Sequence, residues 1–236
     1  MPFSIDNVVP WGRSLEEYRA MFSLSEGDLA CRILGCGDGP ASFNAELSAR
    51  GGSVVSVDPL YRFSAPAIER RVQQTFPTMM AQTGANRGDF VWTHVRSLED
   101  LGRRRMAALH GFLADFEAGR RSGRYVEAAL PVLPFADDAF DLALSSHFLF
   151  LYSAQFDLDF HVAALREMLR VAGEVRVFPL LQLGGAPSPH VPGVRVALAA
   201  PGVRVTVEPV PYEFQRGGNR MLRLHRGDTA DTARCA

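Results

Sequence analysis

One stretch decides the fold of this chain, Ile33-Leu34-Gly35-Cys36-Gly37-Asp38-Gly39-Pro40-Ala41-Ser42-Phe43. Its apolar start predicts a buried strand, its glycines predict a turn too tight for side chains, and residues 41–50 predict a helix. A second apolar run, Val54 to Val57, is followed by the carboxylate of Asp58. This succession is how an open α/β sheet builds a nucleoside pocket at its carboxyl edge.

Length and composition favour one α/β domain with a full core. The chain has 236 residues, of which 47% are hydrophobic and 22% are charged, and a second domain would leave each core small. We expect one domain over residues 1–225, with an amino-terminal helical cap at 1–30, a helical Arg-rich insertion at 62–124 and a disordered tail at 226–236. No apolar run approaches the ~18 to 20 residues that cross a bilayer, and no secretory pattern opens the sequence, so we expect a soluble, cytoplasmic protein.

Two residue types limit the chemistry. The sequence contains no lysine, so all 25 basic residues are arginine. A P-loop and pyridoxal chemistry both need a lysine, and arginine cannot act as a nucleophile because it stays protonated, so the common kinases and pyridoxal enzymes are excluded. The three cysteines, Cys31, Cys36 and Cys235, have no metal-ligand spacing. We therefore expect no metal site, and we expect Cys31 and Cys36 to be small core residues.

Arginines are concentrated between Arg62 and Arg124, where eleven of them stand against six acidic residues. Such a segment usually forms a solvated helix face. The alternative is a rim that attracts an anionic substrate or nucleic acid. Nucleic acid is disfavoured because no recognition motif accompanies the arginines.

The rest of the sequence alternates helices and strands. Ser14, with Glu17 three residues later, predicts a capped helix that runs to Phe22. Further helices are expected at Ala65–Gln82 (interrupted by Pro77), Leu98–Ala118, Phe160–Val171 and Val194–Leu198, and strands at Cys31–Leu34, Tyr125–Ala129, Phe140–Leu144, Val175–Phe178, Val203–Val207 and Arg220–Leu224. The last two strands flank Gly217-Gly218 as a closing hairpin, and the alternation before them predicts a mostly parallel, doubly wound sheet.

Four features follow one another between Ile33 and Phe178. The first two are the glycine loop and the acid Asp58. The third is residues 133–146, which read Leu-Pro-Phe, then an acidic turn, then Phe-Asp at the start of an apolar strand. The fourth is a helix at residues 165–171 that leads into a strand. This succession resembles the class I S-adenosylmethionine-dependent methyltransferases. The resemblance implies an α/β, Rossmann-like, doubly wound sheet of seven strands, mostly parallel, with an antiparallel last strand and flanking helices.

The glycine loop can be aligned with that family in two registers. If Gly35, Gly37 and Gly39 are taken as the family's three glycines, the separation between the first glycine and the second-strand acid, Asp58, is longer than is usual in the family. Counting back from that acid instead aligns Gly37, Gly39 and Ala41 with the three glycines, and Gly35 with an acid. We prefer this register. The family's first-motif carboxylate, which supports the loop and the methionine amino group, is then missing, and Asp38 is the nearest substitute.

The chemistry of the loop favours a sulfonium ligand over a dinucleotide. A pyrophosphate needs backbone amides and a close-packing third glycine. In the dinucleotide pattern Gly-x-Gly-x-x-Gly, counted from Gly37, the third glycine position is occupied by Ser42. In addition, Pro40 removes an amide donor, and Asp38 adds a repelling negative charge. S-adenosyl-L-methionine has no phosphate and carries a positive sulfur and ammonium, so it tolerates these features. Asp58 can accept the ribose hydroxyls of either ligand and does not discriminate between them.

The resemblance also implies the site residues. Pro134 belongs to the stretch that lies against adenine in the family, with a hydrophobic connector as the alternative. His147 follows the fourth strand at the carboxyl edge, where it is a candidate general base or else a structural histidine. Arg13 follows Trp11-Gly12, a segment that either folds over the cofactor or only covers the sheet edge. The expected cofactor-binding residues are Gly37, Asp38, Gly39, Asp58, Pro134, Ser146 and Arg13.

The implied mechanism is direct displacement at the methyl carbon, in which the protein supplies proximity, alignment and proton removal. We therefore expect an S-adenosylmethionine-dependent methyltransferase that acts on a small-molecule acceptor, with an anionic acceptor left open and no membrane partner. A methyltransferase-like module that binds without catalysis is the alternative, and an NAD-dependent oxidoreductase ranks third. The acceptor's determinants are expected in the amino-terminal cap, the insertion and the carboxyl-terminal hairpin, and fold analogy does not supply them.

Overall fold

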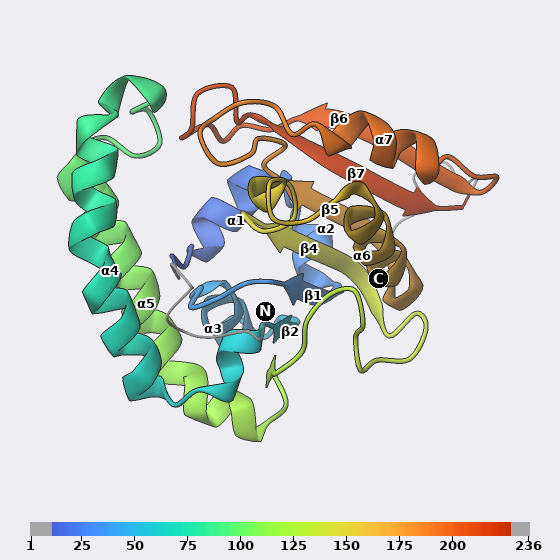
Figure 1. The fold of residues 1–236 in the computed structure, drawn as a ribbon. Helices are drawn as coiled ribbons and strands as arrows, with labels where there is room; N and C mark the ends of the chain where they lie inside the picture. Colours follow the sequence, from blue (N-terminus) through green and yellow to red (C-terminus); the bar gives the residue numbers. More distant parts are fainter. Residues whose placement is uncertain (1–10, 228–236) are drawn as a thin grey trace.

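The computed structural model describes residues 11–227, which form a central β-sheet with helices on both faces (Figure 1). The strands are β1 Arg32–Cys36, β2 Ser53–Val57, β3 Tyr125–Val126, β4 Phe140–Ser146, β5 Ala172–Phe178, β6 Val203–Pro209 and β7 Arg220–Arg226. The helices are α1 Leu15–Phe22, α2 Glu26–Ala30, α3 Phe43–Ala49, α4 Ala65–Ala85, α5 Leu98–Arg121, α6 Leu158–Val171 and α7 His190–Ala197. Residues 1–10 of the expected cap and 228–236 of the expected disordered tail lie outside the described residues.

The strand order confirms the expected fold class. The strands lie in the order β3-β2-β1-β4-β5-β7-β6. All pairs from β3 to β5 are parallel, and β7 is antiparallel to both of its neighbours, β5 and β6. This is the Rossmann-like, doubly wound, seven-stranded α/β sheet, mostly parallel with an antiparallel last strand. The strand order reverses between β1 and β4, and ligands of such sheets bind at the carboxyl edge beside that reversal.

The alternating side chains of β1 show why helices cover both faces of the sheet. Ile33 lies in one hydrophobic cluster with Tyr18 of α1 and Phe43 of α3. Its neighbour Leu34 lies in another with Leu165 of α6. Consecutive strand residues point to opposite faces, so a strand that is apolar on both faces is buried between two layers. The apolar start of the glycine stretch therefore places the loop in the centre of the molecule.

Capping residues define the amino-terminal helices. Ser14 caps α1, and its side chain and that of Glu17 bond reciprocally to each other's backbone N–H groups, as the sequence predicted. The sequence analysis missed α2, although Ser25 and Asp28 form the same capping box. Five residues are too few for an apolar helical period, so the cap was the only local signal for this helix.

Helix α4 corrects the prediction of an interruption at Pro77. The helix is continuous from Ala65 to Ala85 with Pro77 inside it. Proline removes one backbone donor, which weakens a helix locally but need not end it when tertiary packing holds both halves. Here α4 packs along α5, where Phe76 and Met80 both lie against Gly102.

Strand β3 is shorter than the predicted Tyr125–Ala129. It pairs only with β2, through Tyr125 with Ser56 and Val126 with Val57, and then leaves the sheet. Ala129 instead forms an isolated bridge with Val132. The strand lies at the sheet edge, so β2 is its only partner, and β2 ends at Val57 opposite Val126.

The helical insertion spans the carboxyl edge of the sheet (Figure 1). It leaves the sheet after β2, and its distal loop, residues 86–97, contacts the loop between β6 and β7, residues 210–219. The N–H of Val91 donates to the carbonyl of Phe214 at 2.7 Å, and that of Arg216 donates to the carbonyl of Asp89 at 2.9 Å. The ring of Phe90 stacks on Phe214, with 4.8 Å between centroids. The insertion and the closing hairpin thus meet over the glycine loop's edge of the sheet.

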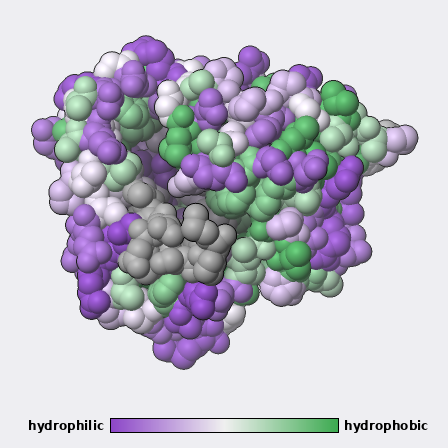
Figure 2. Space-filling model, viewed as in Figure 1, coloured by the Kyte–Doolittle hydropathy of each residue, from purple (hydrophilic) through white to green (hydrophobic). Residues whose placement is uncertain are grey.

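Most arginines of the insertion face solvent. Figure 2 shows hydrophilic residues predominating over α4 and α5 on the viewed face. Arg71, Arg104 and Arg124 are half-buried, and Arg105, with 3% of its surface exposed, lies within the protein. The segment is therefore a solvated face with one inward-pointing arginine. No helix within residues 11–227 is both long and apolar enough to cross a membrane.

Candidate functional site

The glycine loop turns directly out of β1. Gly37 and Gly39 have left-handed backbone conformations, with φ of 72° and 56°. A Cβ atom on Gly37 would lie 2.9 Å from Cγ of Phe148, so this glycine is also required by space. The N–H of Gly37 donates to the carbonyl of Val57 at 2.9 Å, which ties the loop to the end of β2.

The carboxylate of Asp38 is buried beneath the loop. Tyr18 donates its hydroxyl to Oδ1 at 2.7 Å, and Ser56 donates its hydroxyl to Oδ2 at 2.6 Å. A Cβ atom at position 35 would lie 1.8 Å from Oδ2 of Asp38. The Asp38 carboxylate thus occupies the space that a side chain at Gly35 would need, and the acid of the loop reaches this space from a position three residues later.

Asp58 ties the loop to the end of β2. Its Oδ2 accepts the N–H of Gly39 at 2.8 Å, and its Oδ1 accepts the N–H of Leu60 at 2.7 Å. Burial raises the pKa of Asp58 to about 6, and burial together with the charge of Asp58 raises the pKa of Asp38 to about 6. Within residues 11–227 neither carboxylate forms an ion pair. One buried and one half-buried acid without a cation make this part of the site suited to a positively charged ligand.

Ser146 and His147 stand at the carboxyl end of β4, on the other side of the strand reversal. His147 has a left-handed φ of 53°, and its N–H donates to the carbonyl of Phe178 at 2.7 Å. Its Nδ1 lies 2.9 Å from Oγ of Ser146, whose hydroxyl is directed to Sδ of Met21 at 3.9 Å. Burial, followed by the positive charges of Arg13 and Arg105, lowers the pKa of His147 well below its usual value. The imidazole is therefore neutral at neutral pH.

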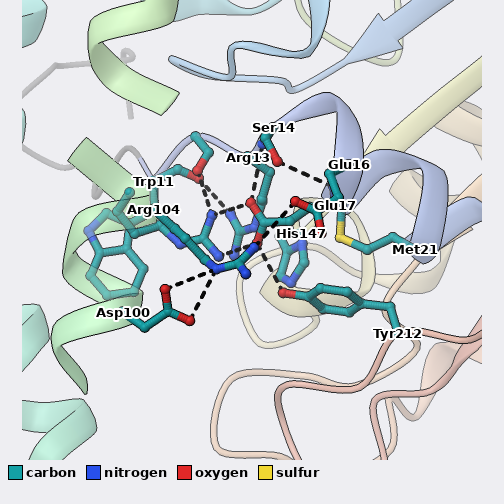
Figure 3. A network of polar contacts seen from close by, with 12 residues as sticks. Trp11, Arg13, Ser14, Glu16, Glu17, Met21, Asp100, Arg104, His147 and Tyr212 are labelled. Carbon is teal, nitrogen blue, oxygen red and sulfur yellow. Dashed lines mark hydrogen bonds and ion pairs between the residues drawn. The ribbon is translucent and has the colours of Figure 1, made fainter. Parts of the chain in front are cut away.

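A third group of side chains closes the site beside His147. Figure 3 shows Arg13, Glu17, His147 and Tyr212 pointing toward one another. Glu17 of α1 forms a buried two-point ion pair with Arg105 of α5, with Nη1 to Oε2 at 2.9 Å and a second, shorter contact from Nη2 to Oε1. Tyr212 donates its hydroxyl to Oε1 of Glu17 at 3.1 Å. The amino-terminal helix, the insertion and the loop of the closing hairpin therefore meet at one carboxylate.

The segment before α1 lies directly on the glycine loop. A Cβ atom on Gly12 would lie 2.0 Å from the carbonyl oxygen of Pro40, so only glycine permits this approach. Arg105 Nη1 also donates to the carbonyl of Gly12 at 2.8 Å. The close approach of Gly12 to Pro40 shows that Trp11-Gly12-Arg13 packs on the glycine loop. That this segment folds over a cofactor, and does not only cover the sheet edge, stays a prediction.

No protein-family model matches the chain. Its sequence is 30% identical over 224 residues to the "Uncharacterized protein MJ0045" of Methanocaldococcus jannaschii, an alignment that covers 94% of this chain and 98% of that protein. The chain belongs to the same family as MJ0045. The printed description of MJ0045 assigns it no activity, so this membership brings no function with it.

Two of the solved structures to which the chain is similar in shape are described as methyltransferases. Magnesium protoporphyrin IX methyltransferase of Synechocystis PCC 6803, with bound SAH, has a TM-score of 0.49 and 12% identity, over 90% of this chain and 81% of that one. A SAM-dependent methyltransferase from Aquifex aeolicus has a TM-score of 0.42 and 14% identity, over 90% and 95% of the two chains. At such values these likenesses add nothing to what the strand order already shows.

The structure brings most of the predicted site residues to one edge. Pro134 is not among them. Its neighbours in the chain are held by the end of α6, where Glu167 accepts the N–H of Leu133 at 2.7 Å and Arg170 Nη1 donates to the carbonyl of Phe135 at 2.8 Å. This end of α6 leads into the start of β5, at the amino edge of the sheet. The predicted residues that do lie at the carboxyl edge are Arg13, Gly37, Asp38, Gly39, Asp58, Ser146 and His147.

Arg105 is the residue of this region that the sequence did not single out. It is one of eleven arginines in the insertion, and nothing in the local sequence marks it as the buried one. Tyr212 belongs to the closing hairpin, where determinants of the acceptor were expected, but no motif marks it. Glu127, the carboxylate nearest to the Leu-Pro-Phe stretch, follows β3 immediately and so lies at the carboxyl edge next to the end of β2, whereas the expected adenine contact was Pro134.

Within residues 11–227, no three His, Cys, Asp or Glu side chains are grouped so that they could hold a metal ion.

The raised pKa of Asp38 predicts a pH-dependent stability. A carboxyl whose pKa rises from 3.8 to about 6 on folding binds a proton more tightly in the folded state, so the free energy of unfolding falls as the pH rises from about 4 to about 6. Asp38→Asn removes this contribution. Between about pH 4 and 6 we therefore expect the free energy of unfolding of Asp38→Asn to rise by about 2 kcal/mol relative to that of wild type. Urea unfolding of the ligand-free proteins at pH 4.5 and 7.5 measures it, with the exposed Asp159→Asn as control, and a difference independent of pH would contradict it.

Proposed function

We propose that the chain binds S-adenosylmethionine at the carboxyl ends of β1 and β2 and transfers its methyl group to a small-molecule acceptor. The observation that carries the proposal is a pair of carboxylates at the glycine loop, Asp38 buried beneath it and Asp58 half-buried beside it, neither of them ion-paired within residues 11–227. An uncompensated buried charge is costly. A ligand that carries a sulfonium and an ammonium group supplies the missing positive charge.

Each residue of the loop region has a role in this proposal. Asp58 follows the second strand, where an acid accepts ribose hydroxyls. Asp38, beneath the loop, binds the ammonium of the methionine part. Gly37 and Gly39 have no side chains, so the ligand can approach the backbone closely. Glu127, directly after the neighbouring strand β3, accepts a hydrogen bond from the amino group of adenine. It thereby takes the place of Pro134 as the expected adenine contact.

The alternatives lose support from the same geometry. The non-catalytic module was motivated by the absent first-motif acid, and Asp38 supplies a carboxylate in the space beside Gly35. An NAD-dependent oxidoreductase requires a pyrophosphate at this loop, next to the carboxylates of Asp38 and Asp58, which would repel it. Neither alternative is favoured by an observation of its own.

For the transfer, we propose that Ser146 and His147 face the acceptor. The bound cofactor supplies an activated methyl group on a good leaving group. We propose the tautomer in which His147 donates Nδ1–H to Oγ of Ser146, 2.9 Å away, so that Nε2 carries the free lone pair. Nε2 would then take the proton of an acceptor hydroxyl, and the cofactor, when bound, would supply the methyl group to the hydroxyl oxygen and leave as the neutral thioether. The insertion and the 210–219 loop enclose this edge of the sheet, which suits a small acceptor.

Two ligands separate the proposed cofactor contacts. S-adenosylhomocysteine carries the amino-acid part, whereas 5′-methylthioadenosine has adenine, ribose and sulfur without it. We expect Asp58→Ala to weaken the binding of both by at least about tenfold, since a lost charged hydrogen-bond acceptor costs ~1.5 to 3 kcal/mol. We expect Asp38→Asn to weaken only S-adenosylhomocysteine. Isothermal titration measures each dissociation constant, with Asp159→Asn as the control.

The proposal fails if wild-type protein does not bind S-adenosylhomocysteine, or if it binds NAD more tightly. It also fails if Asp58→Ala binds both nucleosides as well as wild type does.

The proposed proton acceptor must be uncharged at the pH of the reaction. Since burial and two neighbouring arginines disfavour the imidazolium, we expect His147 to titrate well below 6.5 and to remain neutral at pH 6.5. A ¹⁵N NMR titration measures this, with His147→Gln used to assign its signal. A protonated His147 at pH 6.5 would remove it as a base.

A further inference from the structure

Two arginines, Arg13 and Arg105, act on the one carboxylate of Glu17 in the wall beside His147, where Figure 3 shows Arg13 and Glu17. Both oxygens of Glu17 are taken by Arg105. Arg13 has no ion pair with any acid among residues 11–227, and its one hydrogen bond there runs from Nη1 to the carbonyl of Trp11 at 2.5 Å. The group of Arg13, Arg105 and Glu17 therefore carries one uncompensated positive charge.

The free edge of Arg13 has the shape that a carboxylate takes. Nη1 is used by the backbone, while Nε is buried with no hydrogen-bond partner. The Nε–Nη2 side of a guanidinium presents two parallel N–H donors, which match the two oxygens of a carboxylate. A buried donor left unpaired costs about 1 to 3 kcal/mol. An incoming carboxylate would satisfy this donor and neutralise the charge together.

The position of Arg13 does not favour a purely structural role. The residue immediately precedes Ser14, the N-cap of α1, and positive charge at a helix amino terminus opposes the helix dipole. Burial, followed by the charge of Arg105, lowers the pKa of Arg13 to about 10. Both effects mean that the charged Arg13 side chain lowers the stability of the ligand-free protein. A residue that lowers stability is more readily explained by a role in binding than by a structural role.

Tyr18 interacts with charges of both signs. Its hydroxyl donates to Asp38, one of the two carboxylates without an ion pair among residues 11–227. The positive charge of Arg13 opposes the rise that burial and Asp38 cause in the pKa of Tyr18. A single ligand that presents a cation to Asp38 and an anion to Arg13 would therefore suit this part of the site.

We propose that Arg13 binds a carboxylate group in this site. The carboxylate comes either from the amino-acid part of the cofactor, whose ammonium lies at Asp38, or from an acidic acceptor beside His147. With the first source the inference rests on the proposed function, whereas with the second it concerns the wall of the site alone.

The test compares Arg13→Gln with wild type in two arms. In the first, isothermal titration measures the binding of S-adenosylhomocysteine and of 5′-methylthioadenosine. In the second, sodium succinate serves as the carboxylate probe, and its stabilisation of the protein against heat is measured with and without S-adenosylhomocysteine. Arg103→Gln, on the exposed side of α5, is the matched arginine control. Arg13→Lys keeps the charge but not the planar fork.

A cofactor carboxylate predicts that Arg13→Gln loses at least tenfold in S-adenosylhomocysteine binding with 5′-methylthioadenosine unchanged, and that Arg13→Lys lies between. An acceptor carboxylate predicts that both nucleosides bind unchanged, while saturable stabilisation by succinate is present in wild type and Arg103→Gln and absent in Arg13→Gln. In both cases ligand-free Arg13→Gln melts no lower than wild type.

The inference is overturned if Arg13→Gln changes neither the binding of S-adenosylhomocysteine nor the stabilisation by succinate. It is also overturned if both nucleosides weaken equally or if the ligand-free variant melts lower, since Arg13 is then a structural residue. If wild type binds neither nucleoside, the proposed function fails, and the succinate arm without cofactor still decides whether Arg13 holds a carboxylate.

Discussion

The buried carboxylate of Asp38 constrains the structure around it. It lies between the hydroxyls of Tyr18 and Ser56, in space that excludes any side chain at position 35. Position 35 must therefore be glycine, and Tyr18 must face the loop, which fixes α1 against the sheet. A negative charge held there without a cation has a raised pKa and destabilises the ligand-free protein. The same negative charge favours the binding of a cationic ligand.

The proposed site is polarised along its length. Asp38 and Asp58 lie on the side of the glycine loop, and Arg13 and Arg105 lie on the side of His147. Substrate-sized molecules with separated charges fit such a site better than neutral ones. The helical insertion contributes to this polarity through Arg105 alone, because most of its other arginines face solvent. Its remaining contribution is to reach over the edge and dock on the 210–219 loop.

The sequence predicted those parts of the fold that depend on local patterns. The glycine loop, the cap at Ser14 and the closing hairpin all lie where their residues indicated. Pro77 misled because the packing of α4 on α5 outweighs one missing backbone donor. The role of Arg105 was invisible because burial of one arginine among many is decided by the tertiary contact with Glu17. The resemblance predicted Asp38 as the substitute for an acid expected at position 35, but only the tertiary structure shows its carboxylate in the space beside Gly35.

Moving the acid back tests the account most directly. Gly35→Asp with Asp38→Gly returns the carboxylate to the strand and empties the space that Asp38 fills. Isothermal titration of S-adenosylhomocysteine should then find the double variant within about threefold of wild type. Each single variant should lose tenfold or more, Gly35→Asp through a clash of two acids and Asp38→Gly through the loss of the carboxylate beneath the loop. A double variant that binds as weakly as Asp38→Gly alone would contradict the claim that one carboxylate, in one place, holds the cofactor's positive charge.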